Sequence, residues 1–172
     1  MFKSMESQIK KENGMTFIEV LIALVIMVTG ILGAVAMQAT AKKGSFDAMQ
    51  RSLASSLAQD LIERMRSDDA TTLNAYISTE YGNGVTCDGG CTAFTQTNID
   101  EFELALTGGD VLSGEDNAGG LVGARACVDV SNNAVTVVVT WEGRSVTVDG
   151  NTQDCGATGK NRRQVLVEAF VF

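Results

Sequence analysis

The stretch FIEVLIALVIMVTGILGAVAMQATA (17–41) decides the fold of this 172-residue chain. From Val20 to Ala41 it contains no charged residue, which makes it long enough to span a membrane as a helix. A single carboxylate, Glu19, lies just before this run. A carboxylate at the edge of hydrocarbon is costly unless it is protonated or paired with a cation. The stretch therefore predicts a membrane-spanning helix that contains one acidic residue in need of a partner.

The helical pattern continues beyond the apolar run. Apolar residues recur there at steps of three or four, the spacing of one face of an amphipathic helix. They are Phe46, Met49, Leu53, Leu57, Leu61 and Met65. We expect one continuous helix from about Thr16 to Asp68, apolar all round in its first half and on one face in its second.

The last third of the chain changes to a period of two, which is typical of strands. The segments 124–130 and 134–141 flank Ser131-Asn132-Asn133, a hairpin signal, and 144–148 and 164–172 are further strand candidates. A short helix is expected from Asn98 to Leu106, with loops at 87–91 and 108–120. The predicted fold is α+β: a long N-terminal helix whose second half is covered by a small antiparallel sheet.

Composition excludes several classes of function. The formal net charge is -8, which argues against nucleic-acid binding because that requires a basic surface. The chain has no His, so it lacks the commonest general base and the commonest zinc ligand. No nucleotide-binding or nucleophile-elbow motif is present. We therefore expect neither enzymatic activity nor a cofactor nor a metal site.

The four cysteines, Cys87, Cys91, Cys127 and Cys155, all follow the apolar run. An even number on one side of a membrane segment favours two disulfides in an oxidising compartment. Reduced buried thiols and a four-cysteine zinc site are the alternatives. Of the three possible pairings, the one joining Cys87 to Cys91 and Cys127 to Cys155 is favoured. The disulfide argument also places the N-terminus in the cytoplasm and the acidic remainder outside it.

The residues GMTFIEVLIALVI (14–26) resemble the class III signal of type IV pilins and pseudopilins: a basic leader ending in Gly, an apolar residue, and Glu at the fifth position after the cut. The resemblance implies that a prepilin peptidase cleaves between Gly14 and Met15 and that Met15 is N-methylated. It also implies that Glu19 is the Glu at the fifth position of the processed chain. Met15 replaces the Phe common at this position in the family.

A role for Glu19 follows from physical chemistry as well. Cleavage before Met15 creates a cationic α-amine close to the carboxylate along the helix. In a stack of parallel helices, Glu19 of one subunit can pair with the Met15 amine of its neighbour and so set the axial register. The hypothesis is that this carboxylate is satisfied only in an assembly.

The residues LAQDLIERMRSD (57–68), with the preceding Gly-rich apolar segment, are similar to those of PilV-type minor pilins, also called type IV pilus modification proteins. The CDGGCTAF block (87–94) and the strand-like VTVVVTWEG (135–143) are also similar to that family. The resemblance implies a minor pilin in type IV pilus biogenesis, in a complex that primes assembly or caps the filament tip. The implied partners are the other minor pilins and the major pilin, contacted through the N-terminal helix.

The implied organisation has four parts. Residues 1–14 are a leader, 15–41 the transmembrane and assembly helix, 42–68 the amphipathic half of that helix, and 69–172 a globular head. Before assembly the chain is anchored in the inner membrane with its head in the periplasm, and afterwards it is in the pilus filament. Gly30 and Gly33 either allow local unwinding of the helix or allow close helix–helix contact.

Alternatives remain at this point. Ala34-Val35-Ala36 has the form of a secretory cleavage site, which would give a mature chain starting at Met37. A plain anchor would never be cut. A minor pseudopilin of type II secretion would have the same architecture, and a membrane-anchored adhesin is a further possibility of another class.

Overall fold

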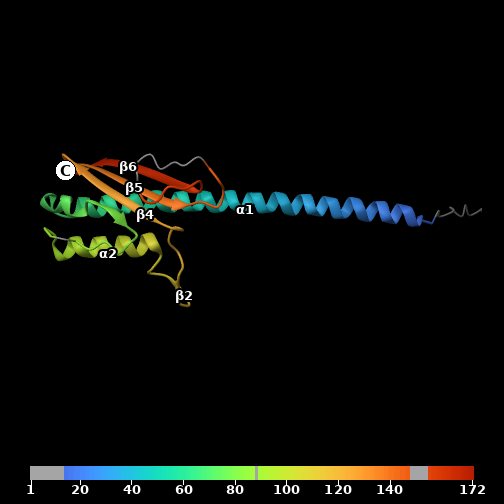
Figure 1. Cartoon of the computed structure of the whole chain (residues 1–172), viewed down its shortest axis with the longest axis horizontal. Helices are drawn as coiled ribbons and strands as arrows, with labels where there is room; N and C mark the ends of the chain where they lie inside the picture. Colours follow the sequence, from blue (N-terminus) through green and yellow to red (C-terminus); the bar gives the residue numbers. More distant parts are fainter. Residues whose placement is uncertain (1–13, 88, 148–154) are drawn as a thin grey trace, which may run out of the picture. The chain divides into compact units, whose positions relative to one another are not determined.

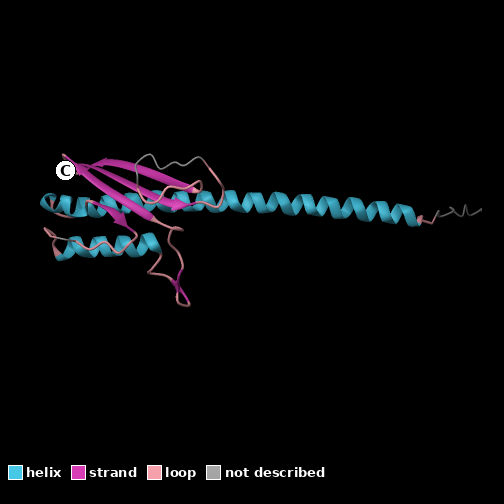
Figure 2. Ribbon diagram, in the orientation of Figure 1, coloured by secondary structure: helices cyan, strands magenta, loops and turns pink. Residues whose placement is uncertain are grey.

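The computed structural model describes residues 14–87, 89–147 and 155–172. The chain falls into two compact units, residues 1–41 and 42–172, and the boundary lies within the first helix. The helices are α1 (Phe17–Ser67), the 3-10 helix η1 (Ala70–Tyr76) and α2 (Ala93–Thr107). The strands are β1 (Ser78–Tyr81), β2 (Leu112–Ser113), β3 (Asp116–Asn117), β4 (Arg125–Ser131), β5 (Ala134–Glu142) and β6 (Arg162–Phe170) (Figures 1 and 2).

Helix α1 confirms the prediction of one continuous helix, because its ends differ from the expected ones by a single residue each. Arg64 and Arg66 lie in its last turn, where cations interact favourably with the helix C-terminus. Asp69 then begins η1, since its Oδ1 accepts a hydrogen bond from the Thr71 N–H at 2.8 Å. The capping residue explains why the long helix stops here without a proline.

The sheet of the second unit is antiparallel, with strand order β1-β4-β5-β6. Strands β4 and β5 form the predicted hairpin, in which Ser131 pairs with Ala134 across a two-residue turn. Asn132 and Asn133 have φ angles of 50° and 64°. A tight hairpin turn requires positive φ at both central residues, and Asn tolerates it better than most residues.

The core of the second unit lies between one face of this sheet and the second half of α1. Alternate residues of β5 face the core, namely Val135, Val137, Val139 and Trp141, all essentially buried. From α1 they meet a stripe that includes Leu57, Leu61 and Met65. The predicted α+β fold, an apolar N-terminal helix with a small antiparallel sheet packed against it, is therefore confirmed.

The predicted apolar face of α1 is wrong at its beginning. Met49 is 57% exposed, and the polar residues Asp47 and Gln50 are buried instead. Gln50 is buried because its Oε1 accepts the Val122 N–H at 3.1 Å. Phe46 is half-buried and lies 4.0 Å from the Arg144 guanidinium, a cation–π contact. Here the helix contacts loops as well as the sheet, so polar anchoring replaces apolar packing.

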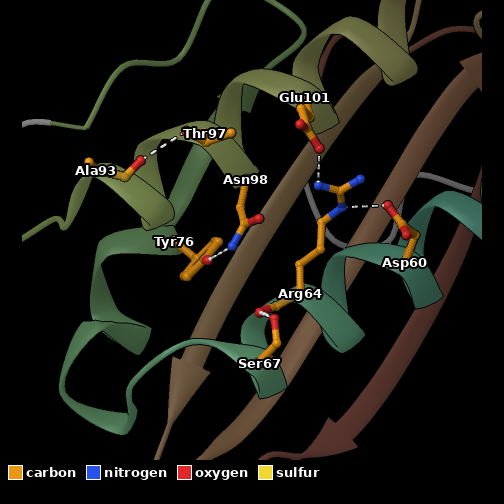
Figure 3. Close-up of polar contacts among 8 residues, drawn as sticks. All are labelled: Asp60, Arg64, Ser67, Tyr76, Ala93, Thr97, Asn98 and Glu101. Atoms are coloured by element: carbon orange, nitrogen blue, oxygen red, sulfur yellow. Dashed lines mark hydrogen bonds and ion pairs between the residues drawn. The ribbon is translucent and has the colours of Figure 1, made fainter.

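Helix α2 begins at Ala93, five residues before the predicted start at Asn98. Thr92 caps it, because its Oγ1 accepts the Thr95 N–H at 3.1 Å. Asn98 is a buried residue within the helix and donates through Nδ2 to the Tyr76 hydroxyl at 2.9 Å (Figure 3). The Asn98–Glu101 pattern, expected as a cap, thus has a tertiary role.

Three strand predictions need correction. Residues 78–81 form β1, an edge strand that was not predicted, and the supposed loop 108–120 contains the small β2–β3 hairpin. The predicted strand 144–148 is not a strand over residues 144–147, and Val148 lies outside the described residues. Residues 144–147 do not pair with β5, because β6 is the strand hydrogen-bonded there. The Arg144 N–H donates instead to the Asp47 carboxylate.

A polar network joins the end of α1 to α2. Arg64 donates through Nε to Asp60 at 2.7 Å and also pairs with Glu101 of α2 (Figure 3). The Asp68 Oδ2 accepts from the Tyr76 hydroxyl at 2.8 Å and from the Thr95 hydroxyl at 2.7 Å. Burial alone would raise the pKa of Asp68, but these hydrogen bonds hold it below the ordinary value. The ionised carboxylate is thus a structural part of the head.

Candidate functional site

The junction between Gly14 and Met15 precedes the first helix. Residues 14–16 are not helical, and the Thr16 carbonyl accepts from the N–H groups of Glu19 at 3.0 Å and Val20 at 3.3 Å. Met15 and Phe17 are largely exposed. The Gly14–Met15 peptide bond is therefore in non-helical, exposed backbone, the form in which a peptidase can bind and cut a chain.

Nothing around Gly14 in the described structure requires a glycine. A Cβ placed there would meet no atom within 4 Å, and its φ is not in the left-handed region. Because the fold does not need a glycine here, Gly14 is consistent with recognition by a processing enzyme.

Glu19 lies in the first turn of α1. Its carboxylate has no ion pair or hydrogen bond with any residue that the structure describes. A carboxylate in the first turn interacts favourably with the helix N-terminus, whether or not it has another partner. This gives Glu19 a local role besides the register role expected from the sequence.

The pair Thr16 and Glu19 also has the Thr-x-x-Glu spacing of a capping box. Because the Thr16 carbonyl accepts the first helical N–H, Thr16 occupies the position that such a box requires. This pattern was not predicted, although its spacing is visible in the sequence. Neither side-chain hydrogen bond of a capping box is formed between Thr16 and Glu19 in the described structure, so Gln at position 19 would keep only the spacing.

Residues 17–45 of α1 are exposed throughout. By length and composition, this is the one helix among the described residues that is apolar enough to cross a membrane, and none of its apolar window is buried by the protein itself. The hydroxyls within it are satisfied internally: Thr29 Oγ1 donates to the Val25 carbonyl at 2.9 Å and Thr40 Oγ1 to the Ala36 carbonyl at 3.2 Å. Such internal bonding suits a helix in lipid, where no water is present to bond them.

Gly30 and Gly33 both lie within this exposed helix. A Cβ at either position would meet nothing within 4 Å outside the helix backbone. No contact inside the described chain explains these glycines, so close packing through them would involve another molecule.

The cysteines lie in two places in the second unit. Cys127 on β4 and Cys155 are joined, with their Cα atoms 5.8 Å apart, and Cys87 and Cys91 are joined across 6.4 Å. Cys155 is fully buried. Among the described residues, no group of three His, Cys, Asp or Glu side chains is placed to hold a metal ion.

The comparison with protein families gives one match. The family model described as the prokaryotic N-terminal methylation motif matches residues 9–35. No curated protein and no solved structure matches the chain. The matched segment contains Gly14, Met15 and residues 17–35 of α1, including Glu19. The chain thus carries a type IV pilin-like N-terminal methylation signal, and this signal precedes a pilin-like α+β fold.

Proposed function

We propose that the chain is a minor pilin, closest to the PilV type, that takes part in type IV pilus biogenesis. A prepilin peptidase cuts it between Gly14 and Met15 and methylates the new amine of Met15. It then acts in the inner membrane with other minor pilins, its head in the periplasm, to prime assembly of the major pilin or to cap the filament tip. The observation that carries the proposal is the methylation motif at residues 9–35, placed at the start of an apolar helix with no covering of its own.

The role of Glu19 in this proposal is to pair with the Met15 amine of a neighbouring subunit. Its carboxylate has no partner among the described residues, and it adjoins 22 uncharged residues. An unpaired charged side chain at the bilayer centre is unfavourable by about 2.5–3.5 kcal/mol. The cost is smaller near the edge of the bilayer, where Glu19 would lie. An assembled neighbour removes that penalty, which makes Glu19 a driving force for assembly as well as a register device.

We propose that the four thiols are oxidised in the mature protein, Cys87 with Cys91 and Cys127 with Cys155. A periplasmic head gives the oxidising compartment in which such bridges persist. Mass spectrometry of the non-reduced, proteolysed protein tests this by finding Cys127 and Cys155 in one cross-linked peptide.

Deletion of the gene, scored for surface pili and for protein secretion in the same strain, tests the function. The proposal expects loss of pili with secretion intact, restored by the wild-type chain. Loss of secretion with normal pili would instead indicate a pseudopilin, and normal pili with lost attachment an adhesin. Either result contradicts the proposal.

A further inference from the structure

A polar pocket of about 200 Å³ opens between α1 and the ends of β5 and β6. All of its lining residues belong to the second unit. The described residues of its wall include Arg51, Arg162 and Arg163, with Asp47 as the one acidic residue described there. In a chain of net charge -8, this is a local excess of positive charge.

The acidic residue of the pocket is already fully engaged. Asp47 Oδ1 accepts the Arg144 N–H at 2.8 Å, and Oδ2 accepts from the Arg163 guanidinium at 3.0 Å. Arg51 lies four residues after Asp47 on the same helix, a spacing at which the two commonly pair. Arg51 nevertheless makes no ion pair or hydrogen bond with any described residue. Its guanidinium therefore lines the pocket without an acceptor among the described residues.

The indole of Trp141 also lines the pocket, and it is only 1% exposed. Its Nε1–H is buried and has no acceptor among the described residues. An indole can only donate, and a buried donor without an acceptor costs about 1–3 kcal/mol. The buried Nε–H of Arg163 is in the same position, with no acceptor in the described part of the chain. Among the described residues, the pocket thus offers guanidinium and indole N–H donors that have no hydrogen-bonded acceptor, and the side-chain oxygen of Gln164 is a buried acceptor in the same lining.

We infer that this pocket binds a carboxylate group, with Arg51 as its ion-pair partner and Trp141 Nε1 as a directed donor. A planar carboxylate has two oxygens, which match the fork of a guanidinium and leave lone pairs for the indole. The volume is below the 300–1,000 Å³ typical of small-molecule sites but accommodates the head of one acidic side chain. The occupant is an Asp or Glu side chain of an adjoining subunit, and this last step alone rests on the proposed function.

The chain contains one tryptophan, so its indole gives a single, directly assignable signal. The full chain in detergent micelles, with its tryptophan labelled with ¹⁵N, is titrated with sodium acetate, with acetamide and with inorganic phosphate while the Nε1–H resonance is followed. The expected result is a saturable downfield shift with acetate and no saturable shift with acetamide. No saturable response to acetate, or saturation by phosphate alone, overturns the inference.

Two variants locate the binding. Arg51→Gln, at an exposed position, should raise the acetate midpoint about fivefold, whereas the control Arg66→Gln on the same helix should leave it unchanged. Trp141→Phe keeps the aromatic ring but removes the donor, and calorimetry should then detect at least a similar loss of acetate affinity. Equal midpoints in wild type and Arg51→Gln would contradict the assignment.

The assembled state identifies the source of the carboxylate. If an adjoining subunit supplies it, the indole signal of assembled protein lies at the acetate-bound position without added acetate, and Arg51→Gln returns it to the free position. A signal at the free position in assembled protein overturns the subunit contact. The acetate titration of unassembled chain does not depend on pilus formation, so failure of the proposed function and failure of the pocket are separable.

Discussion

At the scale of single residues, three carboxylates have contrasting surroundings. Glu19 lies in an exposed first turn without a partner in the described chain, whereas Asp47 and Asp68 are enclosed by donors from other elements. The first arrangement suits a group that acquires its partner by assembly. The second suits groups that hold the head together.

Glu19→Gln tests the assembly role without disturbing the helix start. Gln preserves the capping-box spacing with Thr16 but cannot form an ion pair with an amine, so incorporation into pili should fall at least about fivefold, as for loss of an interaction of 1 kcal/mol or more. Quantitative immunoblotting of sheared pili measures it, with membrane levels as reference.

The matched control is Glu63→Gln, the same change at an exposed site on the same helix, which should incorporate as wild type does. If Glu19→Gln subunits enter pili as efficiently as Glu63→Gln subunits, the charge of Glu19 has no role in assembly.

Asp68 makes the stability of the head dependent on pH. Its pKa is lowered in the folded state, so the native protein binds fewer protons than the unfolded chain near this value. The stabilisation is present above the unfolded pKa, about 4, and is lost as pH falls through the folded value. Chemical unfolding followed by Trp141 fluorescence should show stability falling below about pH 4.

Asp68→Asn should destabilise the head by about 1–3 kcal/mol at neutral pH, because it weakens hydrogen bonds to a charged acceptor. It should also flatten the acid dependence, whereas Asp110→Asn in an exposed loop should change neither. An Asp68→Asn curve parallel to that of wild type below pH 4 would show that another group is responsible.

At the scale of elements, α1 carries two different surfaces along one helix. Residues 17–45 are exposed, and from Asp47 onward one side is buried against the sheet. Periodicity predicted both the helix and most of its buried stripe, because Leu57, Leu61 and Met65 follow the helical spacing strictly. It failed at Met49, since which side of a helix is buried near its entry to the head depends on loops from distant parts of the sequence.

The same reasoning explains the other errors. The β4–β5 hairpin was predictable because its turn chemistry is local, in Asn132 and Asn133. Strand β1 was not, because its four residues become a strand only by pairing with β4. At the candidate site, Gly14, Met15 and Glu19 were predicted from the resemblance of residues 14–26 to the class III signal of type IV pilins. The pocket at Arg51 and Trp141 could not be predicted. It depends on the ion pair of Asp47 with Arg163, which is distant in the sequence, rather than with Arg51 on the same helix.

The buried stripe of α1 gives a prediction at this scale. Leu61→Ala should destabilise the head by about 2–5 kcal/mol, because Leu61 is fully buried in the core. Met49→Ala should change stability by less than about 0.5 kcal/mol, since Met49 is mostly exposed. Denaturant unfolding in detergent measures both, and similar losses for the two variants would contradict the observed orientation of the helix.

The proposed Cys127–Cys155 bridge closes a much longer loop than Cys87–Cys91, with sequence separations of 28 and 4. Removing it by Cys127→Ala with Cys155→Ala should cost about 2–4 kcal/mol, because long loops gain most from closure. The double variant Cys87→Ala with Cys91→Ala should cost less. The order of the two unfolding midpoints checks the prediction, and the reverse order would contradict it.

At the scale of the whole molecule, the two units have complementary requirements. The second unit contains a complete core built from the end of α1, α2 and the sheet. The first has an apolar surface that no described residue covers and that lipid or other subunits can cover. On the proposed function, cleavage of the Gly14–Met15 bond just before that surface converts a membrane-anchored precursor into a subunit with a new charged end.

The mass of the mature N-terminus tests this account most directly. The full chain is expressed in a host that contains a prepilin peptidase, recovered from the membrane fraction, and examined by intact-mass and N-terminal peptide mass spectrometry. The account predicts a chain that starts at Met15 and carries one methyl group on its α-amine. A chain that starts at Met37, or one that retains Met1, would contradict it.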